Sequence, residues 1–156
     1  MRVIVEYTEE VSTPFAFAFF QKIAKRTLKE RRFSFLQGKK ISLNVIAVSE
    51  SKIKKINRKY RGKDAVTDIL SFGEYETRLA LKKEKRKDIF LGEIFFSPAF
   101  IIKRAKRDLS DKTKEATIKE MVYIFSHGVL HLVGFDHEEE MFAIQEKMTK
   151  FFKRQK

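Results

Sequence analysis

Cysteine and tryptophan are absent from the 156 residues of this chain, and proline occurs only twice. Without cysteine there are no disulfide bonds and no thiolate ligands, so any metal must be held by nitrogen and oxygen atoms. This absence suits the cytoplasm, where we expect the protein to work. Long apolar runs are also missing: no segment reaches the roughly 18 to 20 apolar residues that span a bilayer. We therefore expect no membrane partner, and the acidic residues before the apolar run Pro14–Phe20 do not fit a secretory signal.

No linker rich in glycine, proline or serine divides the sequence, so we predict a single domain over residues 1–156. Hydrophobic residues make up 43% of the chain and include 16 phenylalanines. This is enough apolar material for one core in a domain of ordinary size.

Acidic residues are outnumbered by basic ones, 21 against 34, which gives a formal net charge of +13. Such an excess favours a polyanionic partner, because each Lys or Arg that neutralises a phosphate releases a condensed counterion. Nucleic acid is the first candidate. The alternative is a well-solvated surface of the kind found in heat-adapted proteins.

Hydrophobic periodicity predicts the secondary structure, with a period of two for strands and of about 3.6 for helices. Four strands are predicted, over residues 2–7, 41–48, 68–72 and 89–97. Helices are predicted over residues 14–32, 49–60, 97–107, 114–132 and 138–152. These segments predict an α+β fold, in which about five helices surround one mixed four-stranded sheet.

Local signals mark where the predicted helices begin. Pro14 follows Thr13 as a cap and first-turn pair, and Ser97 with Pro98 forms a second such pair. Ser49 is predicted to cap the helix that follows it. Residues 73–88 are mostly charged and are predicted to form an exposed connection.

All three histidines of the chain lie between His127 and His137, in the segment HGVLHLVGFDH. His127 and His131 are four residues apart, so on a helix their rings project side by side, with Cβ atoms about 5 to 6 Å apart. Gly134 can adopt the left-handed conformation that ends a helix, and such a turn brings His137 back toward the pair. Three imidazoles with one coordination position left open are typical of a catalytic zinc site. We therefore predict one Zn²⁺ ion per chain at the end of this long helix, although nickel or copper also suits nitrogen ligands.

The same histidine spacing occurs in the metzincin proteases, in which a Glu directly after the first histidine is the general base. Here Gly128 holds that position. Without a carboxylate there, peptide hydrolysis lacks its usual proton acceptor, which disfavours a protease. Three histidines packed or solvated around a helix end, without metal, remain a further alternative.

The segment HGVLHLVGFDH resembles the signature HGxLHLxGyDH of the YbeY family of metal-dependent endoribonucleases. Two further segments, INRKYRGKDAVTDILSF (Ile56–Phe72) and LGEIFFS, are similar to other blocks of that family and occur in the expected order. The likeness covers most of the chain from Ile41 onward. The chain departs from the family pattern in having Phe135 where Tyr is usual and Glu93 where Asp is usual, and in its highly charged residues 73–88.

The resemblance implies zinc ligands at His127, His131 and His137 and a functional arginine at Arg61. The residues alone support Arg61 less strongly: it lies beside Gly62 between two lysines, and its planar fork suits two phosphate oxygens, but a solvated turn would have the same composition. Asp136 and Glu138 flank the third histidine, either as groups that orient a ligand ring or as exposed acids near a helix start.

The implied function is a zinc-dependent endoribonuclease for ribosomal RNA processing, small-subunit maturation and ribosome quality control. The implied partners are ribosomal RNA and the small ribosomal subunit, with ribosomal or assembly-factor proteins as further candidates. Two alternatives are an RNA-binding assembly factor that does not cut RNA and whose metal is structural, and a metallopeptidase that lacks the usual Glu base.

Overall fold

The computed structural model describes residues 1–108, 114–136 and 138–154. Its strands form one sheet in the order β1-β2-β4-β3. The strands β1 (Arg2–Glu9), β2 (Lys40–Ala47) and β4 (Asp88–Phe96) run parallel, and β3 (Ile69–Gly73) pairs antiparallel with β4 at the edge. The predicted α+β fold with a mixed four-stranded sheet is confirmed.

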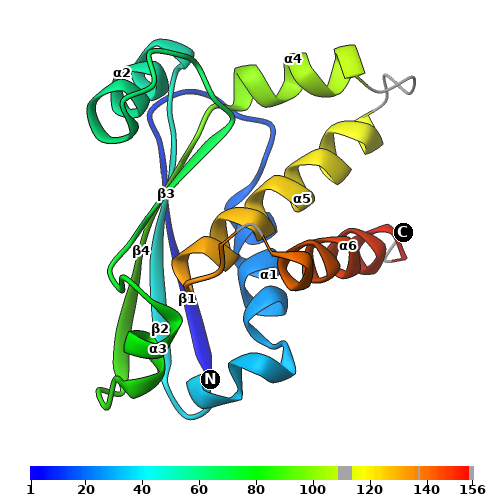
Figure 1. Cartoon of the computed structure of the whole chain (residues 1–156). Helices are drawn as coiled ribbons and strands as arrows, with labels where there is room; N and C mark the ends of the chain where they lie inside the picture. The colour runs from blue at the N-terminus through cyan, green and yellow to red at the C-terminus, as the bar shows by residue number, and fades with distance from the viewer. Residues whose placement is uncertain (109–113, 137, 155–156) are drawn as a thin grey trace.

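Six α-helices and one 3₁₀ helix occur in the described residues. They are α1 (Phe17–Leu28), the 3₁₀ helix η1 (Arg31–Leu36), α2 (Glu50–Arg61), α3 (Arg78–Lys83), α4 (Pro98–Asp108), α5 (Lys114–Leu132) and α6 (Glu139–Lys153). Figure 1 shows α1, α5 and α6 together on one side of the sheet, whereas α2 lies at one end of the strands. None of the described helices is long and apolar enough to cross a membrane.

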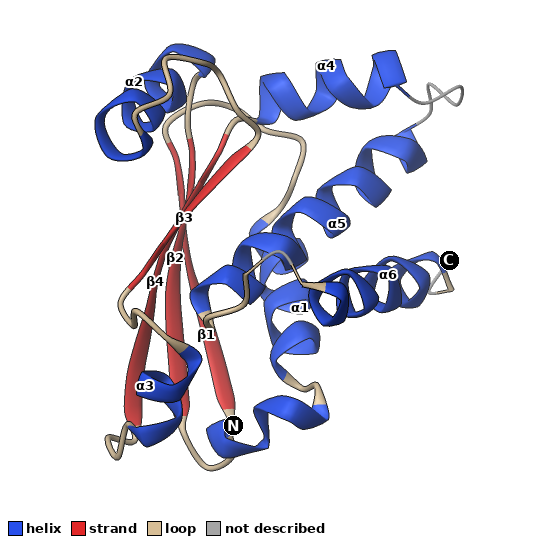
Figure 2. Cartoon of the chain, in the orientation of Figure 1, coloured by secondary structure: helices blue, strands red, loops and turns tan. Residues whose placement is uncertain are grey.

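The main core lies between the sheet and the helices α1, α5 and α6. Alternate residues of β2 are fully buried, as expected for a strand with one face toward the core. From α5, five apolar residues at helical spacing are fully buried: Met121, Val122, Phe125, Val129 and Leu132. The rings of Phe20 on α1 and Phe125 on α5 pack edge to face with centroids 4.9 Å apart. Figure 2 shows α5 beside the sheet, between α4 and α6. Because α5 is embedded in this core, the side chains at its C-terminal end have a fixed support.

The helix starts agree with the sequence signals in part. Ser49 caps α2 as predicted, since its hydroxyl accepts a hydrogen bond from the Lys52 amide. The helix α4 begins at Pro98 as predicted, but the Ser97 hydroxyl is buried without a hydrogen-bond partner in the described residues and makes no cap bond. The first helix begins only at Phe17, because the Thr13 side chain accepts from the Phe15 amide and stabilises a turn instead.

The charged residues 73–88 are not merely a connection, because they contain the short helix α3 with a fully buried Leu81. This helix packs tightly on the turn that follows α5. Gly134 in that turn has the predicted left-handed conformation, with φ of 82°. A Cβ atom at Gly134 would lie only 2.4 Å from the Arg78 backbone nitrogen, so the close approach of α3 requires glycine here.

Candidate active site

His127 and His131 lie in the last turns of α5, and both are partly buried, whereas the residues between them on that helix are buried. Their Nε2 atoms are 2.9 Å apart, and the two ring planes are nearly perpendicular at 87°. The helical spacing thus brings the two rings together, as the sequence indicates. The third predicted ligand, His137, lies outside the described residues.

The protonated nitrogen of each ring is fixed by a partner of known polarity. Gln145 on α6 is fully buried and donates its amide NH₂ to the Tyr123 carbonyl, 3.2 Å away, so its oxygen must face His127 Nδ1 at 3.3 Å. His131 Nδ1 lies 2.8 Å from the Phe135 carbonyl oxygen, which only accepts. Both Nδ1 atoms therefore donate hydrogen bonds, and Nε2 is the nitrogen of each ring that is left to face a ligand.

Two Nε2 lone pairs that face each other at 2.9 Å repel unless a proton or a cation lies between them. Imidazole nitrogen is the ligand type that a zinc-class ion prefers when thiolates are absent. Hydrogen bonding of the other ring nitrogen to an amide or a backbone carbonyl is the usual way in which such ligands are oriented. The arrangement of the histidine pair therefore fits a metal centre.

The histidine pair opens into a cleft of about 920 Å³ between β3 and the helices α2, α4 and α5. Its charged lining includes Arg61, Lys63, Asp68, Glu76, Arg104, Glu120 and Asp136. The volume is within the usual range for sites that hold small molecules or segments of a larger ligand.

Arg61 is the last residue of α2, and Gly62 ends the helix in the left-handed conformation with φ of 68°. The guanidinium donates to the Ser71 carbonyl of the edge strand β3 at 2.7 Å and lies over the Phe72 ring, 5.0 Å from its centroid. A guanidinium has five N–H donors, and the hydrogen bond to Ser71 uses one of them. The structure thus places Arg61 in the wall of the cleft that also contains the histidines.

Comparison with known proteins decides the family. The family model described as "Endoribonuclease YbeY" matches residues 6–154 of this chain. The chain belongs to this family. Proteins named endoribonuclease YbeY from Thermodesulfovibrio yellowstonii and Malacoplasma penetrans are 37% and 34% identical over 76% and 72% of this chain. The aligned part spans 63% of the first of these relatives and 69% of the second.

A solved structure is also similar, namely the solution structure of TM1509 from Thermotoga maritima, with a TM-score of 0.56 and 28% identity. The similarity covers 94% of this chain and 87% of the other. The two chains therefore share the overall fold.

Gly128 shows why this YbeY-family chain has no carboxylate after its first histidine. The residue is buried where α5 meets the sheet. A Cβ atom there would lie 2.9 Å from the Ile69 side chain and 3.1 Å from the Ser71 hydroxyl. A Glu at this position would point into the sheet, so the metzincin arrangement of the base does not fit this packing.

Two carboxylates of the cleft are held by one arginine. Arg104 on α4 forms ion pairs with Asp68 at 2.7 Å and with Glu120 on α5 at 2.8 Å. Partial burial lowers the pKa of Arg104, but the charges of Asp68 and Glu120 outweigh that effect and raise it. Asp68 also accepts a hydrogen bond from the Ile69 amide, so it serves as a cap at the start of β3 as well as an ion-pair partner.

The two acids beside His137 differ in position. Asp136 lines the cleft, whereas Glu138 occupies the cap position of α6 without a side-chain hydrogen bond to that helix.

Sequence reasoning missed Gln145, which holds the His127 ring. Its signal was present: Gln145 is a polar residue at helical spacing from Met141 and Met148, on the buried face of α6.

Proposed function

We propose that this chain is a zinc-dependent endoribonuclease that acts on ribosomal RNA during small-subunit maturation and ribosome quality control. The observation that carries the proposal is the histidine pair, with both Nε2 atoms turned toward each other in a cleft that also holds Arg61. Membership of a family named endoribonuclease YbeY supports the choice of RNA as substrate. We expect the activity in the cytoplasm, where ribosomal RNA is processed.

His127, His131 and His137 would hold the ion, the last on the evidence of the sequence motif. When bound, a zinc ion would act as a Lewis acid and would stabilise negative charge at the reacting phosphate. The protein contributes the orientation of the rings: the Gln145 side-chain oxygen and the Phe135 carbonyl each accept a hydrogen bond from an Nδ1–H group and so keep Nε2 available for the ion.

Arg61 would bind the scissile phosphate. Its hydrogen bond to the Ser71 carbonyl and its contact with the Phe72 ring orient the guanidinium at the rim of the cleft. The remaining N–H donors suit phosphate oxygens, whose negative charge grows in the transition state. Lys63 in the same wall adds a second positive charge for the RNA backbone.

A second function is favoured by the state of the cleft carboxylates. Of the four carboxylates that line the cleft in the described residues, Asp68 and Glu120 are both engaged by Arg104 and are not evident proton acceptors for hydrolysis, which leaves only Glu76 and Asp136. This observation favours an assembly factor that binds ribosomal RNA or the small subunit without cutting it, with the metal in a structural role. Position 128 has no room for a Glu base, so a metallopeptidase would need a base elsewhere, as the sequence already indicates.

A cleavage assay separates these functions. The purified protein is incubated with ribosomal RNA fragments, structured and single-stranded, with and without a chelator, and casein serves as the peptidase control. The proposed enzyme cuts RNA only when metal is present and leaves casein intact. RNA that is bound but never cut would identify the assembly factor, and cleavage of casein would identify the peptidase.

A further inference from the structure

A second hollow, of about 450 Å³, lies beside α3. We call it the α3 groove. It is lined by residues from three elements: Arg32 and Phe35 from η1, Arg78, Leu79 and Lys82 from α3, and Glu140 from α6. All of α3 lies within the charged residues 73–88, and no residue of α3 lines the cleft of the histidine site.

The charge of the α3 groove is positive, because three cations line it against one carboxylate. Glu140 forms its ion pair with Arg32. In the described parts of the chain no carboxylate lies within ion-pair distance of Arg78 or Lys82. These two cations are therefore not neutralised locally, and the groove favours an anionic ligand.

The α3 groove adjoins the cleft through Arg78. The Arg78 guanidinium lies over the Phe135 ring, 4.3 Å from its centroid, and Phe135 itself lines the cleft. The Gly134 backbone packs directly on Arg78, which fixes α3 against the turn after the histidine helix. Arg78 thus contacts a residue of the cleft and itself lines the α3 groove, together with Lys82.

We propose that the α3 groove binds the sugar-phosphate backbone of RNA where the strand leaves the cleft, with Arg78 and Lys82 each contacting a phosphate. This inference rests on the proposed function, since it extends the path of the same RNA. The half-buried Phe35 ring and Leu79, which is 59% exposed, provide apolar surface for a ribose or a base beside those phosphates. Two adjacent sites along one strand raise affinity by keeping the second contact intramolecular.

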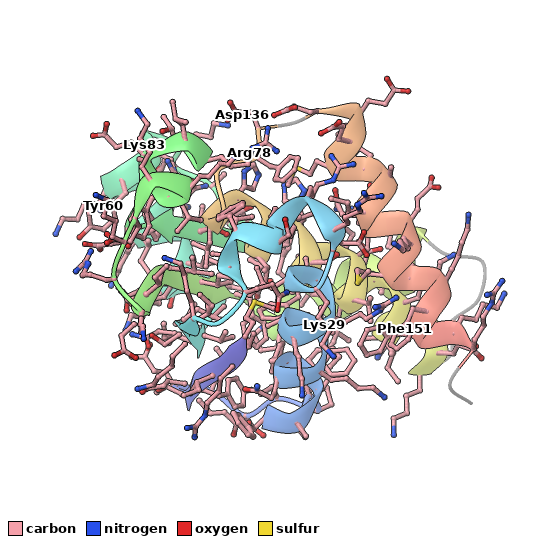
Figure 3. All side chains as sticks on the ribbon, turned by 90° about the horizontal axis from the view of Figure 1, so that it is seen from below. Lys29, Tyr60, Arg78, Lys83, Asp136 and Phe151 are labelled. Atoms are coloured by element: carbon pink, nitrogen blue, oxygen red, sulfur yellow. The ribbon has the colours of Figure 1, made fainter. Side chains whose placement is uncertain are left out.

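The test compares Lys82→Gln and Arg78→Gln with Lys83→Gln in the full-length protein. Lys83 is the matched control, because it is an exposed lysine on the same helix that does not line the groove (Figure 3). Binding is measured over a range of salt for two single-stranded RNAs of about four and about sixteen nucleotides, the span of known single-strand site sizes. Thermal unfolding checks that each variant folds.

We expect Lys82→Gln and Arg78→Gln to weaken binding of the longer RNA by roughly fivefold each and to lower its salt slope by about 0.7 per lost phosphate contact. Binding of the short RNA and the behaviour of Lys83→Gln should not change. Equal losses for Lys82→Gln and Lys83→Gln, or equal losses for both RNAs, would overturn the inference. If the unmodified protein neither binds nor cuts RNA, the proposed function itself is refuted. Failure of the inference and failure of the proposed function therefore give different results.

Discussion

The two sides of the cleft are built differently. On one side, α5 is embedded in the core, and Gln145 and the Phe135 carbonyl fix both histidine rings. On the other side, Arg61 ends an exposed helix and is held by one hydrogen bond and one ring contact. The difference indicates that the two sides have different roles. The core holds the metal ligands in a fixed geometry, and the exposed wall provides a cation that can adjust to a polymer substrate.

The largest expected effect is the loss of the metal on the histidine side. In His127→Ala and His131→Ala the pair of facing Nε2 atoms no longer exists, so bound zinc should fall from about one ion per chain to nearly none. RNA cleavage should disappear with it. Elemental analysis of the purified variants measures the metal content, and Glu146→Gln, an exposed change on α6, is the control. A His131→Ala protein that retains zinc would contradict the shared site.

Arg61 tests the opposite side of the cleft. Arg61→Ala should keep the fold, the metal and most RNA affinity, but should lose cleavage rate by about 10²-fold, because a donor to developing charge matters more in the transition state than in the ground state. Arg61→Lys should restore only part of the rate, since a point charge cannot replace a two-pronged contact. Single-turnover cleavage and RNA binding are measured together. Equal losses in rate and affinity would make Arg61 a docking residue only.

Substitution of Gln145 tests whether metal binding depends on the hydrogen bond that orients the His127 ring. Gln145→Leu removes the acceptor for His127 Nδ1, and metal affinity should fall about 10- to 100-fold, as is typical when such a supporting partner is lost. Competition with a chelator measures the affinity. The control is Gln21→Leu, because the Gln21 amide likewise bonds two partners, the Val3 carbonyl and the Val5 amide, but lies away from the cleft. If both variants lose metal equally, general destabilisation explains the effect of Gln145→Leu.

The fold and one half of the site were accessible from the sequence for the same reason: both depend on short-range periodicity. Alternation over residues 41–48 marked β2, and the four-residue spacing of His127 and His131 marked one face of a helix. Motif similarity added Arg61, which the structure places across the cleft from a helix far away in the sequence.

What the sequence left out depends on contacts between distant segments. Gln145 reaches His127 across 18 residues, and Arg104 joins Asp68 and Glu120, so that this ion-pair cluster combines three segments far apart in the sequence. The helix α3 was missed because it has a single buried anchor, Leu81, in a segment of charged residues, so no apolar period is visible. Such features become apparent only when the packing of the elements is known.

The smallest expected effect concerns the contact that ties the histidine helix to the sheet. In Gly128→Ala, the new methyl group would lie 2.9 Å from Ile69 and 3.1 Å from the Ser71 hydroxyl. Overpacking of this kind costs about 1 to 3 kcal/mol, and the better helix propensity of alanine offsets up to about 1 kcal/mol. The free energy of unfolding should therefore fall by about 1 kcal/mol in denaturant titrations. Gly73→Ala is the control, because its methyl group would lie 3.5 Å from the nearest atom, an ordinary contact. Unchanged stability of Gly128→Ala would show that α5 can shift on the sheet. The histidine side of the cleft would then be less rigid than its burial in the core indicates.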